Sequence, residues 1–184
     1  MKTLYTPRLI LRQFNKADAN DFFEYAQNPN IGPNAGWKPH ESKEESRMVL
    51  ERFITGQDEY AIVYKENGKV IGSLGFYADK VRSIIGAYNI GYVLHEAYWG
   101  RGLMPEAVHA VLEFLFVDYV ANVVSVAHFP QNMRSRRVIE KCGFVYEGTL
   151  RHVRRLYNGQ MMDCMTYSML KEEYFTMYPV AGRC

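Results

Sequence analysis

The sequence lacks a long apolar run, a strong charge of either sign and a regular set of cysteines. No stretch of it reaches the roughly 18 consecutive apolar residues that a membrane-spanning helix needs. Its 22 basic and 20 acidic residues nearly cancel to a formal net charge of +2, which gives no broad field for DNA or an anionic membrane. The three cysteines are odd in number and share no metal-ligand spacing, which fits a reducing compartment better than a disulfide framework.

The remaining composition is that of an ordinary globular protein. Hydrophobic residues make up 48% and charged residues 23% of the chain, and a length of 184 residues is usually filled by one domain. The N-terminal segment MKTLYTPRLILRQF has no apolar core followed by a small-residue cleavage site, so we expect no signal peptide and a cytoplasmic location. The five histidines are scattered without a His-x3-His pair, so no metal site is expected.

Hydrophobic periodicity predicts a mixed α+β domain. The expected strands cover residues 8–14, 60–65, 70–77, 87–94, 123–127, 148–156 and 161–169. The expected helices cover residues 19–27, 43–54, 105–119 and 132–142. Asn67-Gly68 and Asn158-Gly159 mark two hairpin turns, whereas residues 28–41, rich in proline and glycine, are expected to form a loop.

The segment YWGRGLMPEAV, residues 98–108, places a Gly-x-Gly turn directly before a helix. Gly100 and Gly102 permit positive φ angles, so the backbone amides of residues 101–104 can point together at an anion, supported by the helix dipole and the intervening arginine. Two familiar nucleotide loops do not fit, because no Lys-Ser/Thr pair follows Gly102 and Pro105 stands where a third glycine belongs. The segment therefore predicts a phosphate site, with a plain connecting turn as the alternative.

Five segments, in this order along the chain, resemble the GNAT N-acetyltransferases. They are TPRLILR (6–12), GKVIGSLGF (68–76), NIGYVLHEAYWGRGLMPEAV (89–108), PQNMRSRRVIEKCGFVYEGTLR (130–151) and YNGQMMDCMTYSML (157–170). The branch that they resemble contains the ribosomal-protein alanine and serine N-acetyltransferases. The resemblance implies a GNAT fold, with a twisted, mostly antiparallel central sheet and helices on both faces, and acetyl-coenzyme A as cosubstrate.

The resemblance also implies the ligands of the cofactor's pyrophosphate. The family's loop, Arg/Gln-x-x-Gly-x-Gly/Ala, matches residues 99–104 with two departures: Trp99 replaces the first polar residue and Met104 the small last one. The Met104 side chain must turn into the protein if its amide is to stay available. The implied pyrophosphate ligands are the backbone amides of Gly100, Arg101, Gly102, Leu103 and Met104.

Further cofactor contacts are implied beside this loop. Val93 and Leu94 offer backbone groups to the pantetheine arm, or simply pack as strand residues. Asn132 contacts the pantetheine, or only caps a helix. Ser135 lies beside the cofactor sulfur and supplies a proton to the departing thiolate, or is an ordinary helix residue. Three arginines of the same helix either reach the ribose phosphate or form a solvated face: Arg134, Arg136 and Arg137.

Acetyl transfer to an amine requires a base, because the attacking nitrogen must be neutral. In the related ribosomal acetyltransferases the glutamate of a Glu-Gly pair is a proposed base, and Glu147 matches it. Alternatively, Glu147 is only an exposed carboxylate on an edge strand. In that case Glu96, Tyr92 or a water chain accepts the proton. No cysteine stands beside a suitable histidine, so direct transfer without a covalent enzyme intermediate is expected.

The sequence indicates least about which residues bind the acetyl acceptor. By the resemblance, residues 31–40 border the acceptor groove, and Trp37 within them either lines that groove or packs into the core. The resemblance implies a monomeric or homodimeric N-acetyltransferase of a primary amine, such as a protein N-terminal α-amine. The alternatives are an acetyltransferase of a small amine (a polyamine, amino sugar or antibiotic) and a catalytically silent acyl-coenzyme A sensor.

Overall fold

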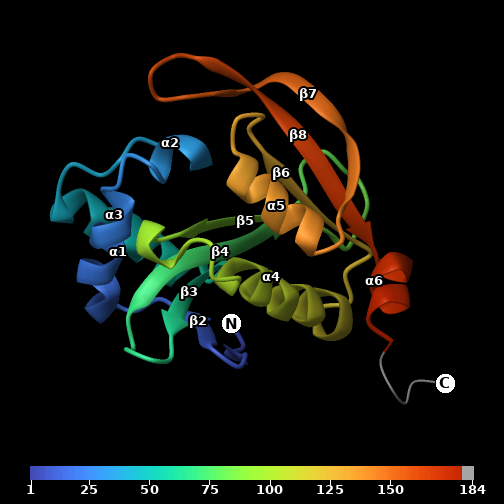
Figure 1. Cartoon of the computed structure of the whole chain (residues 1–184), viewed down its shortest axis with the longest axis horizontal. Coiled ribbons are helices and arrows are strands. Elements are labelled where there is room, and N and C mark those ends of the chain that lie inside the picture. Colours follow the sequence, from blue (N-terminus) through green and yellow to red (C-terminus); the bar gives the residue numbers. More distant parts are fainter. Residues whose placement is uncertain (180–184) are drawn as a thin grey trace.

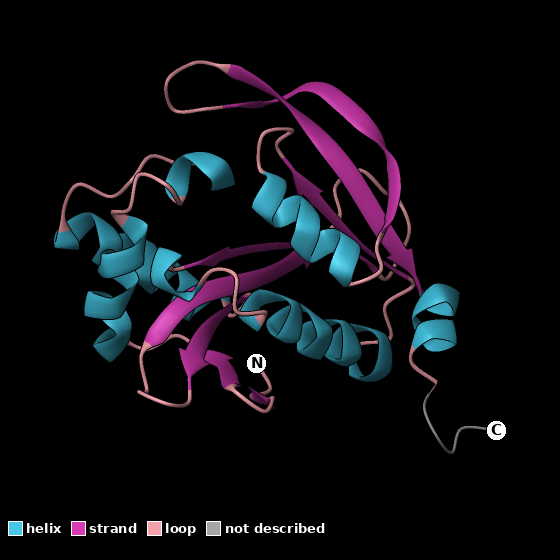
Figure 2. Ribbon diagram, viewed as in Figure 1, coloured by secondary structure: helices cyan, strands magenta, loops and turns pink. Residues whose placement is uncertain are grey.

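The computed structural model describes residues 1–179, so Cys184 lies outside the described residues. An eight-stranded sheet of order β1-β2-β3-β4-β5-β6-β8-β7 forms its centre (Figures 1 and 2). The strands are β1 (Leu4–Tyr5), β2 (Leu9–Gln13), β3 (Glu59–Tyr64), β4 (Val70–Ala78), β5 (Ala87–Leu94), β6 (Val123–His128), β7 (Val145–Arg155) and β8 (Met161–Leu170). Among the strands of residues 1–179, only β5 and β6 are parallel neighbours, which confirms the predicted mostly antiparallel sheet.

The helices pack on both faces of the sheet. They are α1 (Ala19–Ala26), α2 (Gly32–Ala35), α3 (Lys43–Gly56), α4 (Leu103–Glu113), α5 (Met133–Lys141) and α6 (Lys171–Met177). Because side chains alternate along a strand, β3 contributes side chains to two hydrophobic cores, one on each face of the sheet. Ala61 packs with Phe22 of α1 and Leu50 of α3, whereas Ile62 packs with Leu112 of α4. The helices on both faces agree with the expected fold.

Three of the strands and α-helices were not predicted, and one helix begins earlier than expected. The missed elements, β1, α2 and α6, are all short. Helix α4 starts at Leu103 rather than at Pro105, because Gly102 adopts a φ of 74° and serves as its N-cap. Proline is tolerated inside this first turn, where no backbone N–H has an intrahelical partner. The expected continuation to residue 119 changes into a wider π-helical turn over Phe114–Asp118.

The parallel pair opens into a fork. β5 and β6 are in register only from Ala87 and Val123 to Ile90 and Val126, although β5 continues to Leu94 and β6 to His128. Beyond Ile90 the edge of β5 that faces β6 therefore has no strand partner among residues 1–179. Helices α4 and α5 lie in front of this fork, while the long β7–β8 hairpin arches above it toward α2 (Figure 1).

Candidate active site

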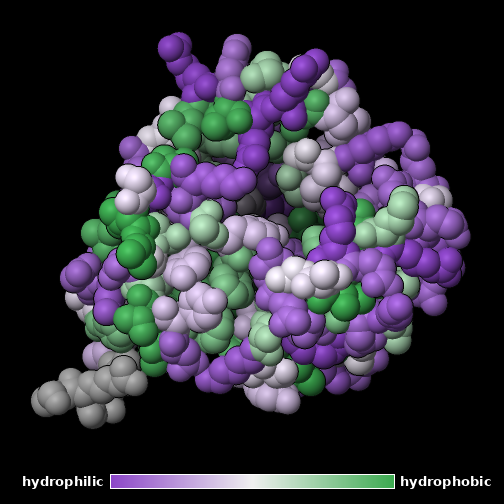
Figure 3. Space-filling model, turned by 180° about the vertical axis from the view of Figure 1, so that it is seen from behind, coloured by the Kyte–Doolittle hydropathy of each residue, from purple (hydrophilic) through white to green (hydrophobic). Residues whose placement is uncertain are grey.

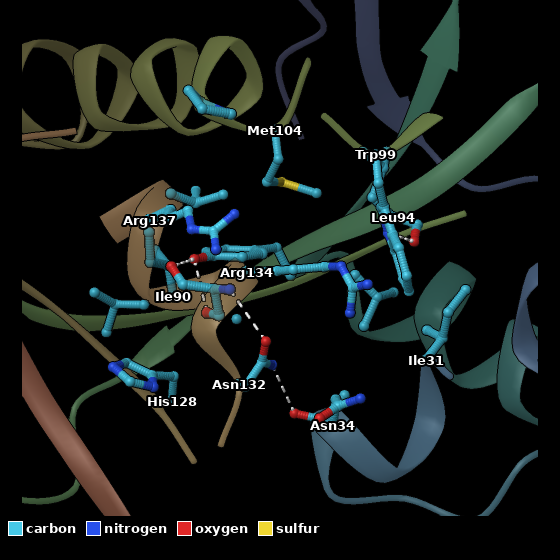
Figure 4. Close-up of a pocket in the computed structure, with 18 of the residues that line it drawn as sticks. Ile31, Asn34, Ile90, Leu94, Trp99, Met104, His128, Asn132, Arg134 and Arg137 are labelled. Carbon is cyan, nitrogen blue, oxygen red and sulfur yellow. Dashed lines mark hydrogen bonds between the residues drawn. The ribbon is translucent and has the colours of Figure 1, made fainter. Parts of the chain in front are cut away.

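A cavity of about 560 Å³ occupies the fork (Figure 4). Its walls come from β5, β6, the loop before α4, the first turn of α4, one side of α5, the segment around α2, and the β7–β8 hairpin. The sequence places these segments far apart, and the sheet brings their ends together. The cavity is therefore built where two parallel strands separate, a common location of ligand sites in sheets with parallel strands.

The loop before α4 presents its backbone to the cavity. Gly100 and Gly102 both have a φ of 74°, a conformation that favours glycine. A Cβ atom on Gly100 would meet no atom within 4 Å, and one on Gly102 would meet only Arg8 at 3.6 Å. In the described part of the chain, the turn and loop hydrogen bonds use none of the amides of residues 101–104. Such free amides at a helix N-terminus fit a diphosphate.

A carboxylate anchors this loop from outside. Glu106 of α4 accepts hydrogen bonds from Thr6 Oγ1 at 2.6 Å and from Arg8 Nε at 2.7 Å. Arg8 in turn donates to the carbonyl oxygen of Arg101 at 2.9 Å. Burial alone would raise the pKa of Glu106, but these bonds and the charge of Arg8 together lower it. Glu106 therefore stays ionised and ties the loop to the N-terminal strands.

The two departures from the family loop have structural explanations. Trp99 Nε1 donates to the carbonyl oxygen of Leu94 at 2.8 Å, and the guanidinium of Arg134 lies 4.3 Å from the Trp99 ring centroid. Met104 is 4% exposed and packs in the core under α4, as an open loop requires. Trp99 thus links the loop to the end of β5 and positions a cation over the cavity (Figure 4).

The Arg101 side chain points away from the cavity. Its guanidinium carbon lies 5.9 Å from the Tyr64 ring centroid and 5.6 Å from that of Tyr98, and Arg101 is the one residue of 99–104 that does not line the cavity. The positive charge that faces the cavity comes instead from Arg134 and Arg137 of α5, which point into it (Figure 4).

Asn132 and Ser135 meet at the start of α5. Asn132 Oδ1 accepts from Ser135 N at 3.1 Å, so the expected cap is present, while its Nδ2 donates to the carbonyl oxygen of Asn34 at 3.2 Å. Ser135 Oγ lies 3.0 Å from the hydroxyl of Tyr92 on β5. Burial raises the pKa of Tyr92, which the bond to Ser135 only partly opposes, so this hydroxyl stays protonated. All four side chains line the cavity, as do Val93 and Leu94.

Glu147 lies outside the cavity lining, in an ion pair. Both of its carboxylate oxygens contact Arg82 Nη2, at 2.5 and 2.6 Å, and Ser168 Oγ donates to it at 2.9 Å. Arg82 also contacts the carboxylate of Asp79 at 2.6 Å. Ser125 Oγ donates to that same carboxylate at 2.7 Å and accepts from Asn89 Nδ2 at 2.9 Å.

This network connects the cavity with Glu147 through side chains, because Asn89 lines the cavity. Burial alone would raise the pKa of Asp79, but its bonds from Ser125, Val81 and Arg82 lower it overall. Asp79 is therefore ionised and holds Arg82 in place beside Glu147.

The other two sequence candidates also lie outside the lining. Glu96 accepts hydrogen bonds from Asn30 Nδ2 at 3.0 Å and Asn28 Nδ2 at 2.9 Å, which lower its pKa. Trp37 packs against the core under α1 and α3, in contact with Gly32. The expected acceptor-side segment, residues 31–40, does reach the cavity, but through Ile31, Asn34 and Ala35.

Sequence analysis missed His128 and Cys164, which both line the cavity. His128 ends β6, with Nδ1 2.8 Å from the carbonyl oxygen of Phe129 and Nε2 3.3 Å from the Tyr167 hydroxyl. Burial raises the pKa of the Cys164 thiol, which Arg154 partly opposes. The available signal for His128 was its position at the end of a strand that borders the fork.

Within residues 1–179, no group of three or more His, Cys, Asp or Glu side chains is arranged to hold a metal ion. None of the helices in this part of the chain has the length and apolar character needed to span a membrane.

The model of the acetyltransferase (GNAT) domain family matches residues 8–145. The chain is 30% identical over 179 residues to p20, an uncharacterized N-acetyltransferase of Bacillus licheniformis, covering 95% of this chain and 99% of that protein. It is 26% identical over 171 residues to the ribosomal protein uS5-alanine N-acetyltransferase of Escherichia coli (strain K12), covering 87% and 86% of the two chains.

A solved structure of a GNAT acetyltransferase has the same fold. The crystal structure of a GNAT-family acetyltransferase from Bacillus anthracis superposes with a TM-score of 0.84 at 22% identity, covering 94% of this chain and all of that one. GNAT acetyltransferases use acetyl-coenzyme A as their acetyl donor. On the family match, the named relatives and the shared fold, this chain belongs to the GNAT family of N-acetyltransferases.

Proposed function

We propose that this chain binds acetyl-coenzyme A in the fork between β5 and β6 and acetylates a primary amine there. The observation that carries the proposal is the coincidence of two features in one cavity: the unpaired edge of β5 and the free amides of the glycine loop. When bound, acetyl-coenzyme A supplies an activated acetyl group. The amides of residues 100–104 hold its pyrophosphate, and the backbone of Val93 and Leu94 holds its pantetheine arm.

Ser135 and Asn132 serve the reacting end of the cavity in this proposal. Ser135 Oγ donates a proton to the departing thiolate and is reprotonated by the proton that the attacking amine releases. The Tyr92 hydroxyl, 3.0 Å away, stays protonated and holds the Ser135 side chain in place. Asn132 holds Ser135 through its capping bond and contacts the pantetheine arm. An N–H of the β5 edge stabilises negative charge that develops on the acetyl oxygen.

Glu147 is the proposed proton acceptor, acting through water. Its carboxylate is engaged by Arg82 and lies outside the lining, so an amine in the cavity does not reach it directly. His128 is the competing base, because it lines the cavity and an unprotonated imidazole nitrogen can accept a proton from an amine bound there. The acceptor that we propose is a protein N-terminal α-amine, with a small amine as the alternative. The first choice is supported by the E. coli relative, whose name describes it as an alanine N-acetyltransferase of ribosomal protein uS5.

The test begins with calorimetric titration of the protein with acetyl-coenzyme A, coenzyme A and ATP. We expect both coenzyme A forms to bind and ATP to bind much more weakly, since the loop lacks a triphosphate motif. Absence of heat and of thermal stabilisation with all three ligands would refute the cofactor assignment.

Glu147→Gln then tests the base. Loss of a general base lowers kcat by about 100-fold or more, with the Kd of acetyl-coenzyme A unchanged. If Glu147→Gln leaves kcat intact and His128→Asn abolishes it, the role belongs to His128. If acetyl-coenzyme A binds but no amine is acetylated, the chain is an acyl-coenzyme A sensor.

A further inference from the structure

The charged residues that line the cavity are all basic. They are Arg134, Arg137 and Lys141 of α5 and Arg154 of β7, and no Asp or Glu belongs to the lining among the described residues. Basic groups beside the phosphates of a cofactor are expected, but Arg154 is on a different element from the other three. Arg154 therefore brings positive charge to a part of the cavity wall that α5 does not form.

Arg154 enters from the hairpin, away from the phosphate loop. In β8 the side chains of Tyr167 and Met169 pack in the core with α4, so Cys164 and Ser168 face the opposite side of the sheet. Arg154 lies beside Cys164 on that side, where its charge opposes the raised pKa of the thiol. Seen from behind, the molecule has a hollow in this face with hydrophilic side chains around much of its rim (Figure 3).

The hairpin closes this end of the cavity against α2. A Cβ atom on Gly36, directly after α2, would lie 3.4 Å from Phe129 and 4.0 Å from Leu156 at the hairpin tip. The cavity wall here combines α2 and the hairpin, and Arg154 is its one charged contribution among residues 1–179. This is the end at which an acceptor can enter without displacing the cofactor's phosphates.

Arg154 has no protein partner in the described part of the chain, unlike many other arginines. Arg8, Arg12, Arg82 and Arg136 each pair with a carboxylate at 2.5–2.7 Å. An exposed, unpaired guanidinium at a cavity mouth is available to bind a carboxylate or phosphate, which its planar fork matches.

We propose that Arg154 binds an anionic group of the acceptor, so that the preferred acceptors are primary amines carrying a carboxylate or phosphate near the amine. This inference rests on the proposed acetyltransferase function. A lining without carboxylates gives a polyamine no counter-charge. The same basic lining favours the neutral form of a bound amine, because nearby positive charge lowers an amine's pKa, and the neutral form is the one that attacks.

The experiment compares matched acceptors by binding and by turnover. The probes are the peptide amides Ser-Asp-Glu-Ala and Ser-Lys-Lys-Ala, free aspartate and O-phosphoethanolamine as small anionic amines, and spermidine. Binding is measured by calorimetry with coenzyme A present, and kcat/KM with acetyl-coenzyme A. We expect anionic acceptors to be preferred by at least about tenfold, which is about 1.4 kcal/mol. A preference for the acidic peptide would indicate a protein acceptor, and a preference for aspartate or O-phosphoethanolamine would indicate a small-molecule acceptor. Either result supports the inference.

Variants at the hairpin complete the test. Arg154→Gln is expected to raise the KM and Kd of the anionic acceptor about tenfold, and Arg154→Glu to shift the preference toward the basic peptide. Arg155→Gln, the adjacent arginine outside the lining, is the matched control. Thermal denaturation checks the fold of each variant.

Two outcomes overturn the inference. Preference of the wild type for spermidine or the basic peptide does so, as does an Arg154→Gln variant with unchanged binding of the anionic acceptor. In both cases acetyl-coenzyme A still binds, so the proposed function survives. Failure of acetyl-coenzyme A to bind would remove the proposed function and this inference together.

Discussion

The two ends of the cavity are built from different parts of the polypeptide. The phosphate end is made by backbone: two glycines at a φ of 74° and the free amides of the first turn of α4. Of its neighbouring side chains, Arg101 turns over two tyrosine rings, and Met104 is buried in the wall of the cavity. The acceptor end is made by side chains, among them Asn34 of α2 and Arg154 on the hairpin.

This difference explains what can vary at each end. A backbone-built site tolerates new side chains as long as they leave the amides accessible, so Trp99 and Met104 can replace the family's usual residues without closing the loop. A side-chain-built site changes its ligand with a single substitution. We therefore expect variants at the phosphate end to act on the cofactor alone and variants at the acceptor end to act on the amine alone.

The largest expected effect is at the phosphate end. Gly102→Glu places a carboxylate beside the pyrophosphate, and two like charges at about 4 Å cost on the order of 4 kcal/mol at an effective dielectric of 20. We expect the Kd of acetyl-coenzyme A to rise by about a thousandfold. Gly102→Asn is the control, because asparagine tolerates a positive φ and adds no charge. Equal binding by both variants would mean that the pyrophosphate does not lie at this loop.

Much of the phosphate end could be predicted from the sequence, because glycine spacing before a helix reports directly on backbone geometry. The limits of β5 and the cap at Asn132 are also local properties, and the structure has both. The burial of Met104, expected from the need for a free amide, is confirmed.

The acceptor end could not be predicted in the same way. Arg154 belongs to a basic run with Arg151, His152 and Arg155, but which member of that run reaches the cavity depends on how the β7–β8 hairpin folds. His128 ends a predicted strand, but that end borders the cavity only because β5 and β6 separate. Arg82 lies in the β4–β5 connection, so its ion pair with Glu147 was equally invisible in the sequence. Helix α2 was missed because prolines and glycines normally interrupt helices, whereas here Pro33 falls within the first turn.

A second prediction concerns the stability of the fold, which should depend on pH through Glu59, a residue outside the cavity lining. Burial raises the pKa of Glu59 on β3 from 4.5 to about 7, although Tyr77 and Ser73 donate hydrogen bonds to it. The folded chain therefore keeps a proton that the unfolded chain releases. The resulting stability is fully present below about pH 4.5 and is lost as the pH rises through 7, by an amount on the order of 3 kcal/mol.

Glu59→Gln removes this titration. Free energies of unfolding in urea, measured between pH 5 and 8, should decline with pH in the wild type and stay flatter in the variant. Identical slopes for the two proteins would show that Glu59 is already ionised at pH 5. Glu59 does not line the cavity, so acetyl-coenzyme A binding by Glu59→Gln at pH 6 serves as the control.

The smallest expected effect gives the sharpest comparison of the two ends. Arg134 lines the cavity over Trp99, and Arg134→Gln should raise the Kd of acetyl-coenzyme A about fivefold, or about 1 kcal/mol, by removing one cation–π contact and one charge. Arg136→Gln, on the same helix but paired with Glu140 at 2.7 Å outside the lining, is the matched control. Arg154→Gln should leave the Kd of acetyl-coenzyme A unchanged and weaken only the acceptor. If Arg134→Gln and Arg154→Gln weaken both ligands alike, the cavity acts as one basic surface, and the division into a backbone-built cofactor end and a side-chain-built acceptor end is wrong.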